Sequence, residues 1–308
     1  MILVTGATGF AGSHLLDRLP PDTRVTAWAR PGGRPPREQP HVQWHAVDLL
    51  DRAAVARAIA QTQPRTIYHL AGAPHVGSSF DNPVEPLAIN ALGTHYLLGA
   101  VDAHARAARV VVVTSAMIYR RSNEPHTEAS PAVPSSPYGL SKLAQDRLAA
   151  LAASDGLDIV IARPFNHTGA RQDPSFSVPG FARQIARIEA GLDAPVLQVG
   201  NLEAERDITD VRDVVDAYAA IAARGEAGTA YNVCSGRAWR IGDLLDMLLR
   251  QTPVPIGVEV DSTRLRPVEL PRLAGDNSRL RGLGWAPRIS VEDMLAGVLE
   301  YWRAQTPR

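Results

Sequence analysis

The stretch that decides the fold is residues 2–12, Ile-Leu-Val-Thr-Gly-Ala-Thr-Gly-Phe-Ala-Gly. Its apolar start, residues 2–6, predicts a strand, and a helical pattern follows at residues 10–19. Gly6, Gly9 and Gly12 lie at the junction. Glycines placed there let the backbone turn tightly and approach a pyrophosphate at the positive end of the helix. Three glycines could also form only a tight turn, but their place between strand and helix favours a dinucleotide site.

The rest of the first half continues this alternation of strand and helix. Apolar, β-branched runs alternate with helical patterns, which is typical of a parallel sheet with helices on both faces. Two proline-rich loops, residues 31–40 and 120–137, interrupt the pattern. The prediction is an α/β fold with a Rossmann-type, doubly wound parallel sheet. We expect strands at residues 2–6, 24–29, 42–47, 66–70, 109–115 and 158–163, and helices at residues 10–19, 51–61, 84–107 and 138–153.

The second half contains shorter elements and indicates a smaller, interleaved C-terminal substrate domain. Helices are expected near residues 178–190, 211–223, 241–250 and 291–303. We expect residues 206–234 to return to the main sheet. The dinucleotide-binding domain would then comprise residues 1–165 and about 206–234, and the substrate domain about 166–205 and 235–308.

Composition excludes several classes of protein. The 308-residue chain has 32 basic and 32 acidic residues, with no basic block that would indicate nucleic-acid binding. It also lacks an apolar run of about 18 residues, so we expect no membrane association. Cys234 is the only cysteine, which predicts a buried, inert thiol and a reducing compartment. Met1 leads straight into the first strand without a signal peptide, and we expect a cytoplasmic protein.

The only lysine of the chain, Lys142, follows Tyr138 by four positions in the run 135–142, Ser-Ser-Pro-Tyr-Gly-Leu-Ser-Lys. On a helix this spacing places both side chains on one face. An ammonium group beside a phenol lowers the phenol pKa from its ordinary value of about 10. Ser115, at the end of a predicted strand, could hydrogen-bond a substrate carbonyl while Tyr138 protonates it. A serine there is also a common turn former, but together with Tyr138 and Lys142 it favours catalysis.

The end of the second predicted strand indicates which dinucleotide binds. An NAD site usually has a carboxylate there for the ribose 2′-hydroxyl, whereas an NADP site has arginine. Here the strand carries no acid and ends in Arg30, with Arg34 and Arg37 in the following loop. This favours NADP(H), although NAD(H) is an alternative and Arg30 could be an ordinary surface arginine. Asp48, after the third strand, is placed to accept from the adenine amino group or to cap the next helix.

These motifs together resemble the extended short-chain dehydrogenase/reductases of the nucleotide-sugar epimerase/dehydratase group, over residues 2–303. Segments 199–218 and 266–280 are similar to the branch that handles GDP-4-keto-6-deoxymannose, and its 4-reductases in particular. The segments that carry the general resemblance are TGATGFAG (5–12), VDL (47–49), YHLAG (68–72), HVGSSFDNP (75–83), VTSAMIY (113–119), YGLSK (138–142) and RPFNHTG (163–169).

The resemblance implies roles for individual residues. Ser115, Tyr138 and Lys142 would be catalytic, with Lys142 also holding the nicotinamide ribose. Arg206 and Arg266 would grip the substrate diphosphate as bidentate donors, although either could be an ordinary salt-bridge partner. The remaining substrate contacts would be Ser79, Asn166, Val178, Asn201 and the ribose-binding Glu269. The cofactor contacts would be Gly6, Thr8, Gly9, Phe10, Ala11, Gly12, Arg30, Asp48, Leu49, Leu70, Ala71, Gly72, Tyr138, Lys142, Phe165 and His167, of which His167 could instead be structural; no metal is implied.

One departure from the family pattern narrows the activity. The 4,6-dehydratases of this group carry a glutamate two residues after the serine/threonine position, and this chain has Met117 there. A thioether provides no acid/base chemistry. We therefore expect an NADPH-dependent C4 reductase acting on a nucleotide-diphosphate 4-keto-6-deoxy sugar. The alternatives are an NDP-sugar 4-epimerase with tightly bound NAD and a non-catalytic NADP-binding regulator. Apolar residues on several faces of helices 84–107 and 138–153 predict a homodimer.

Overall fold

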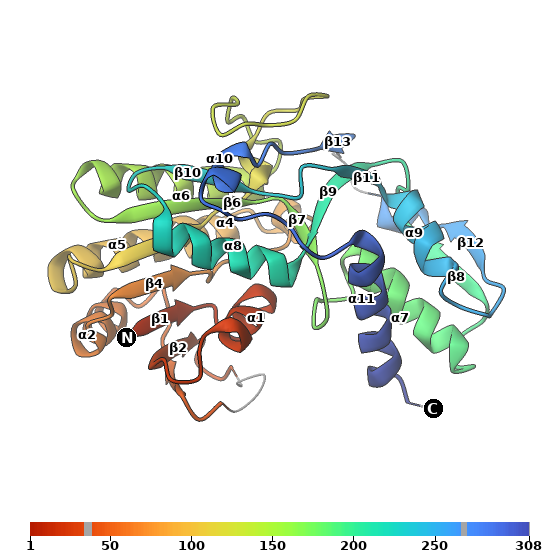
Figure 1. The fold of residues 1–308 in the computed structure, drawn as a ribbon, viewed down its shortest axis with the longest axis horizontal. Coiled ribbons are helices and arrows are strands. Elements are labelled where there is room, and N and C mark those ends of the chain that lie inside the picture. Colours follow the sequence, from red (N-terminus) through yellow and green to blue (C-terminus); the bar gives the residue numbers. More distant parts are fainter. Residues whose placement is uncertain (34–38, 266–269, 308) are drawn as a thin grey trace.

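A large, entirely parallel sheet organises the N-terminal part of the molecule (Figure 1). The computed structural model describes residues 1–33, 39–265 and 270–307. The seven strands have the order β10-β6-β5-β4-β1-β2-β3, so the chain starts in the middle, winds to one edge and then returns to build the other. Their bounds are β1 Ile2–Thr5, β2 Val25–Ala29, β3 Val42–Ala46, β4 Thr66–His69, β5 Arg109–Val113, β6 Ile159–Pro164 and β10 Ala230–Val233.

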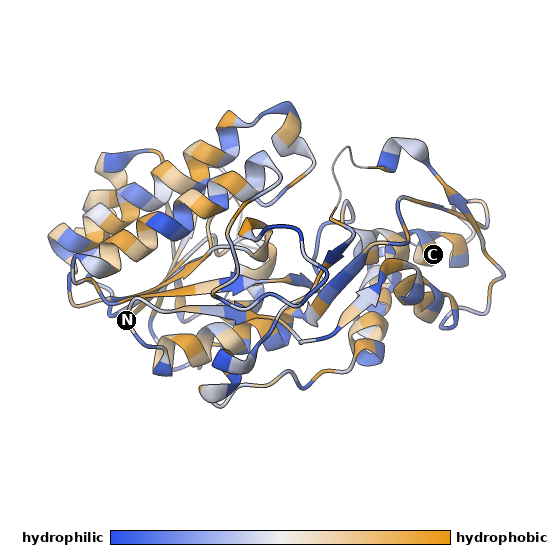
Figure 2. Ribbon diagram, turned by 90° about the horizontal axis from the view of Figure 1, so that it is seen from above, coloured by the Kyte–Doolittle hydropathy of each residue, from blue (hydrophilic) through white to orange (hydrophobic). Residues whose placement is uncertain are grey.

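Helices cover both faces of this sheet because its strands are buried on both sides. On one face, α1 (Phe10–Arg18) and α8 (Val211–Arg224) share an apolar core with alternate residues of the strands. On the other, α2 (Arg52–Thr62), α5 (Gly93–His104) and α6 (Pro137–Ser154) enclose a second core. Figure 2 shows these helices banded with apolar and polar residues, as expected for helices with one face on a core.

A second lobe holds the remaining elements around a core of its own. Strands β11 (Ala238–Arg240), β9 (Glu205–Asp210) and β13 (Arg272–Leu273) form a small sheet, and β7 (Asn166–Thr168) pairs with β9. Strands β8 (Val196–Val199) and β12 (Gly257–Val260) pair separately. Helices α7 (Ser177–Glu189), α9 (Ile241–Leu249) and α11 (Val291–Gln305) gather in this lobe, away from the large sheet (Figure 1). The short remaining helices are α3 Ser78–Asp81, α4 Val84–Pro86, η1 Leu87–Leu92, η2 Ala116–Ile118, η3 Ser262–Arg264 and α10 Ser278–Gly282.

The predicted α/β fold is confirmed, and the expected strands of the first half lie within two residues of β1 to β6. Two expectations need correction. Residues 84–107 are not one helix, because the backbone widens into the π-helical turn η1 between α4 and α5. Residues 206–234 do not return as a whole to the large sheet: α8 and β10 belong to it, whereas β9 pairs with the small sheet. The exact domain boundaries stay a prediction.

None of the described helices combines the length and the apolar character that crossing a membrane requires.

Candidate active site

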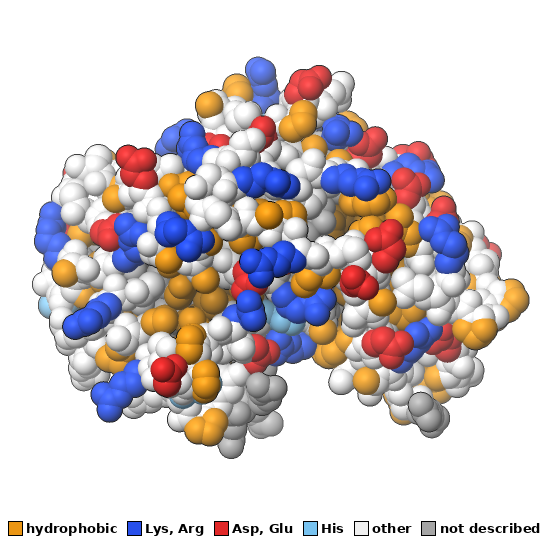
Figure 3. Space-filling view, viewed as in Figure 1, with side chains coloured by type: hydrophobic (Ala, Val, Ile, Leu, Met, Phe, Trp, Pro, Cys, Tyr) orange, Lys and Arg blue, Asp and Glu red, His pale blue; other side chains and the backbone are white. Residues whose placement is uncertain are grey.

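A cleft of about 1030 Å³ lies between the carboxyl ends of the large sheet and the second lobe. One wall comes from the segments that follow β1, β4 and β5, and the other from residues 171–181 and 198–201. This is the edge where ligands bind in open α/β sheets. In the space-filling view, basic side chains gather where the two lobes meet (Figure 3). The described residues contain no group of three or more His, Cys, Asp or Glu side chains arranged to hold a metal ion.

The glycine loop forms the cleft wall next to β1. Gly6 has φ +66°, a left-handed conformation that favours glycine, and a Cβ there would lie 2.6 Å from the backbone nitrogen of Ala71. A Cβ on Gly12 would collide with the carbonyl oxygen of Gly6. Helix α1 begins at Phe10 without a side-chain cap on its N-terminal N–H groups. The loop therefore has the close backbone and the free helix end that fit a dinucleotide pyrophosphate.

Ser115 and Tyr138 meet on the wall formed by the carboxyl end of β5. Ser115 caps η2, and its Oγ accepts a hydrogen bond from the Met117 nitrogen at 3.1 Å. Tyr138 occupies the first turn of α6, which Ser136 caps by accepting from the Gly139 nitrogen at 3.0 Å. The Ser115 side chain lies close enough to the Tyr138 phenol to act on its pKa, and both side chains line the cleft. The structure thus brings together two of the expected catalytic groups from segments more than 20 positions apart.

Lys142 also lines the cleft, one helical turn after Tyr138. Its Nζ donates to the carbonyl oxygen of Val113 at 3.2 Å and to Oε1 of Gln145 at 2.8 Å. Burial lowers the pKa of Lys142 to about 7, because the charged form is poorly solvated there.

The expected electrostatic effect of Lys142 on Tyr138 needs correction. We expected the ammonium to lower the pKa of Tyr138. In the structure, burial raises the pKa of Tyr138, and the hydrogen bond from Ser115 partly offsets this. Desolvation is the larger effect because Tyr138 is buried in the wall of the cleft. The phenol is therefore held in its protonated form at neutral pH, ready to donate a proton.

Asn90 and Ser141 support this wall and were missed from the sequence. Asn90 lies in η1, is fully buried, accepts from the Ala73 nitrogen at 2.9 Å and donates to Oγ of Ser141 at 2.8 Å. A Cβ on Gly72 would lie 2.6 Å from Oδ1 of Asn90, so Gly72 lets the two segments approach. An asparagine inside an otherwise apolar helical run was the signal that could have revealed this contact.

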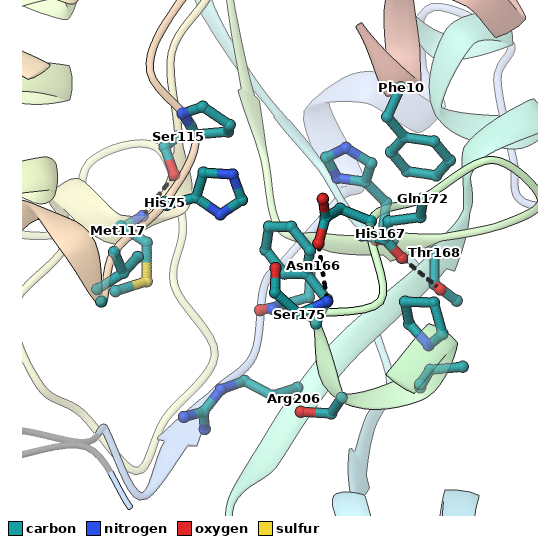
Figure 4. Close-up of a pocket in the computed structure, with 18 of the residues that line it drawn as sticks. Phe10, His75, Ser115, Met117, Asn166, His167, Thr168, Gln172, Ser175 and Arg206 are labelled. Carbon is teal, nitrogen blue, oxygen red and sulfur yellow. Dashed lines mark hydrogen bonds between the residues drawn. The ribbon is translucent and has the colours of Figure 1, made fainter. Parts of the chain in front are cut away.

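Aromatic and polar side chains line the part of the cleft across from Ser115 and Met117 (Figure 4). Phe10 and His167 stack with ring centroids 5.7 Å apart, and burial lowers the pKa of His167. Gln172 accepts from the hydroxyl of Thr168 at 2.6 Å. Arg206, on β9, donates to the carbonyl oxygen of Glu205 at 2.8 Å and reaches the cleft from the small sheet. The other expected residues that line the cleft are Gly9, Ala11, Leu70, Phe165, Asn166, Val178 and Asn201.

Several expected site residues lie outside the cleft lining. Ser79 is buried; its Oγ donates to the carbonyl oxygen of Val76 at 2.6 Å and accepts from the Tyr138 nitrogen at 3.2 Å, so it braces the start of α6. Asp48 is exposed and accepts from the Leu50 nitrogen, while Asp51 caps α2. The others outside the lining are Thr8, Arg30, Leu49 and Ala71, whereas Arg34, Arg37, Arg266 and Glu269 fall outside the described residues.

The parallel sheet, the glycine loop and the cleft are those of a Rossmann-type dinucleotide-binding protein, and comparison defines the family. The model of the GDP-mannose 4,6 dehydratase family matches residues 3–298. The chain belongs to this family.

Individual relatives resemble the chain over its whole length. It is 35% identical to the GDP-6-deoxy-D-mannose reductase of Pseudomonas aeruginosa, over 99% of this chain and 97% of the relative. It is 32% identical to a dTDP-glucose 4,6-dehydratase of Streptomyces griseus, over 98% of this chain and 93% of the relative. The structure of RMD from Pseudomonas aeruginosa complexed with NADPH has a TM-score of 0.86 at 33% identity, covering 99% of both chains. The Thermus thermophilus UDP-glucose 4-epimerase complex with NAD has a TM-score of 0.87 at 27% identity, again covering 99% of both chains.

Proposed function

We propose that the protein uses NADPH to reduce the C4 ketone of a nucleotide-diphosphate 4-keto-6-deoxy sugar. The substrate is GDP-4-keto-6-deoxy-D-mannose and the product a GDP-6-deoxyhexose such as GDP-rhamnose. The observation that carries the proposal is the meeting of Ser115, Tyr138 and the buried Lys142 in the lining of one cleft. The likeness to a GDP-6-deoxy-D-mannose reductase over the full chain supports this choice of substrate.

The residues of the cleft divide the chemistry between them. Bound NADPH supplies a hydride to the carbonyl carbon. Tyr138 donates its proton to the carbonyl oxygen, and burial favours the protonated phenol that this step needs. The Ser115 hydroxyl donates a hydrogen bond to the same oxygen and orients the ketone. Lys142 holds the cofactor ribose and stabilises the phenolate that remains after the transfer.

The cofactor assignment rests on the glycine loop and on the end of β2. Gly6, Gly9 and Gly12 accommodate the pyrophosphate at the start of α1. Arg30 is exposed at the end of β2, where no carboxylate competes for the ribose, and it contacts the 2′-phosphate of NADP(H). The NADPH complex of RMD supports this preference, and the NAD complexes of other relatives keep NAD(H) as the alternative.

The substrate diphosphate lies toward the second lobe in this proposal. Arg206 enters the cleft from β9, and a guanidinium group suits bidentate recognition of phosphate oxygens. Asn166 and Asn201 line the same region and contact the sugar nucleotide. Val178 and the first turn of α7 border the place of the base.

The residue at position 117 favours a reductase over a dehydratase. It lies in the cleft wall next to Ser115, where a dehydratase needs a carboxylate to move protons (Figure 4). A thioether neither donates nor accepts protons at neutral pH. Methionine at this position does not exclude a 4-epimerase, which is the second candidate. Epimerisation at C4 needs only a hydroxyl acid/base and a bound dinucleotide.

Cofactor consumption distinguishes the two candidates. The purified protein is mixed with NADPH and GDP-4-keto-6-deoxy-D-mannose, and the loss of NADPH absorbance is compared with product formed. A reductase oxidises one NADPH for each product molecule, whereas an epimerase acts on a GDP- or UDP-hexose without consuming NADPH. Tyr138→Phe should lower kcat by roughly 10²–10⁴-fold, while Tyr96→Phe, on α5 outside the cleft lining, serves as the matched control.

We also propose that the protein is a homodimer through η1, α5 and α6. Leu140 and Leu151 are exposed on one stripe of α6, and the exposed Leu92 lies on the neighbouring η1. Exposed leucines on adjacent helices mark an interaction surface. Sedimentation should give a dimer for the native protein and a monomer for Leu140→Glu combined with Leu151→Glu. The exposed Leu192 lies in the second lobe, and Leu192→Glu should leave the dimer intact.

A further inference from the structure

A chain of buried polar side chains leads away from Lys142 into the large sheet. Nζ of Lys142 donates to Oε1 of Gln145 at 2.8 Å, and Nε2 of Gln145 donates to Oγ1 of Thr94 at 2.9 Å. The same Thr94 oxygen lies 2.8 Å from Nε2 of His69, whose Nδ1 lies 2.8 Å from Oγ1 of Thr5. All five side chains are at most 5% exposed. The four residues beyond Lys142 have no part in the proposed reaction.

The chemistry of each group determines the direction of these hydrogen bonds. An ammonium group only donates, so the Gln145 amide must present its oxygen to Lys142 and its NH₂ to Thr94. The Thr94 hydroxyl donates its own hydrogen to the carbonyl oxygen of Asn90 at 2.6 Å. It therefore accepts from both Gln145 and His69, and His69 carries its proton on Nε2.

The far end of the chain reaches the backbone next to the glycine loop. With its proton on Nε2, His69 accepts at Nδ1 from the Thr5 hydroxyl. Thr5 Oγ1 in turn accepts from the Ala71 nitrogen at 3.3 Å. Ala71 is the residue against which Gly6 packs without a Cβ. The orientation of the lysine is thus connected, bond by bond, to the segment that shapes the cofactor loop.

We propose that Gln145, Thr94 and His69 are positioning residues that keep the Lys142 ammonium charged and directed at the cleft. Among the described residues, Gln145 and the Val113 carbonyl accept two of its three N–H groups, which leaves the third for the cleft. The inference deepens the proposed function and rests on it for the role of Lys142.

The charges around Lys142 make this support necessary. Burial works against the ammonium and lowers the pKa of Lys142 to about 7. Among the described residues, β4 presents His69, and β5 and α5 present the Val113 carbonyl and the Thr94 hydroxyl. On its own helix, the buried Tyr138 and Asp146 lie four positions to either side, and the Asp146 charge is paired with Arg163. Burial, reinforced by the nearby lysine, lowers the pKa of His69 to about 3, so the imidazole is neutral and does not repel the ammonium. The acceptor oxygen of Gln145 is therefore one of two groups within the described residues that stabilise the charge by direct hydrogen bonds.

The experiment uses the fact that Lys142 is the only lysine. Protein grown with lysine labelled with carbon-13 at Cε gives one lysine resonance, and its shift is followed against pH. Gln145→Met removes the acceptor and should lower the midpoint by about one to two pH units. Gln145→Glu keeps an acceptor, adds a negative charge and should raise it. These two variants shift the same signal in opposite directions.

Thr94 provides the decisive variants because it does not touch Lys142. Thr94→Val removes the hydroxyl that orients the Gln145 amide, so the amide can turn its NH₂ toward the ammonium and the midpoint should fall. Thr94→Ser restores the hydroxyl and should restore the native midpoint. Circular dichroism at each pH confirms that the variants are folded. If Thr94→Val does not fold, the proposal is tested by the two Gln145 variants, which should shift the Lys142 midpoint in opposite directions.

A folded Thr94→Val that titrates like the native protein overturns the proposal, and so does a Gln145→Met with an unchanged midpoint. The pH profile of kcat offers a second measure. Activity that needs the charged lysine falls as the pH rises through its pKa, and this fall should move to lower pH in Thr94→Val by the same interval as the resonance. The titration needs neither substrate nor cofactor. A native protein inactive on the keto sugar would therefore contradict the proposed function and leave the titration result standing.

Discussion

The ring of Phe10 lies parallel to the imidazole of His167, with 5.7 Å between centroids and 5° between planes (Figure 4). Phe10 is the first residue of α1, immediately after the glycine loop, and His167 belongs to β7, which pairs with the small sheet. Nδ1 of His167 lies 3.0 Å from the carbonyl oxygen of Phe165, which sets the plane of its ring. The stack therefore connects the loop that would hold the cofactor to the second lobe.

We predict that Phe10→Leu weakens this connection. A stacked aromatic pair contributes about 0.5–1.5 kcal/mol beyond the area it buries, which corresponds to a fall in Tm of roughly 1–2 °C for a chain of 308 residues. The affinity for NADPH should fall as well, because the loop loses its support. Thermal unfolding and NADPH fluorescence titration measure the two effects. Phe10→Tyr keeps the ring and is the control; native values in the leucine variant would show that the stack is not needed.

Arg30 should determine the preference between the two dinucleotides. Arg30→Ala removes the guanidinium at the end of β2 and should raise the KM for NADPH about tenfold, since a charged hydrogen bond at an exposed site is worth about 1.5 kcal/mol. The KM for NADH should hardly change, because NADH has no 2′-phosphate. Steady-state kinetics with both cofactors test this. Arg24→Ala, also exposed but at the opposite end of β2, is the matched control.

Breaking the buried ion pair of Arg163 and Asp146 should lower the free energy of unfolding strongly. Asp146 accepts from Nε and Nη2 of Arg163 at 2.8 and 2.9 Å, and both side chains are buried. Removing one partner of a buried pair leaves an uncompensated charge and costs about 3–5 kcal/mol. Asp146→Ala should lower the free energy of unfolding in urea by this amount. Asp193→Ala breaks the exposed pair with Arg187 and should leave the free energy of unfolding almost unchanged, because water solvates both charges once they separate.

The buried histidine of β4 should make stability depend on pH. The pKa of His69 falls from 6.5 to about 3 on folding because the ring is buried beside Lys142. Above pH 6.5 His69 is neutral in both states, so it takes nothing from the stability of the folded protein there. Between pH 6.5 and about pH 3, His69 binds a proton in the unfolded chain but not in the folded chain. The free energy of unfolding therefore decreases as the pH falls through this range.

Between pH 6.5 and pH 5 the loss from His69 alone amounts to about 2 kcal/mol. Urea unfolding at both pH values measures it. His69→Gln should lower the stability at either pH yet reduce the difference between them by this amount. His95→Gln changes an exposed histidine of α5 and should leave the difference as it is. Equal differences in the native protein and His69→Gln would mean that folding does not lower the pKa of His69.

Much of this architecture was predictable because its causes are local. The alternation of apolar runs and helical periods placed β1 to β6 and the helices α1, α2 and α6 within two residues. The glycine loop was identifiable because close backbone packing tolerates few other residues, and the Tyr138–Lys142 spacing is a property of a single helix. Two features could not be predicted from the local sequence pattern: the π-helical turn η1 and the pairing of β9 with the small sheet.

The sequence by itself determined the fold class and the place of the glycine loop and suggested the candidate catalytic side chains, since each depends on residues close together in the chain. Only the tertiary structure decided how those side chains are charged and held. Burial raised the pKa of Tyr138 where the sequence suggested a lower one, and Lys142 obtained its partners from β5 and from Gln145. Thr5 and His69 meet across 64 positions of chain. The burial of a group and its contacts with distant segments depend on the whole fold, so they could not be predicted from the pattern of neighbouring residues.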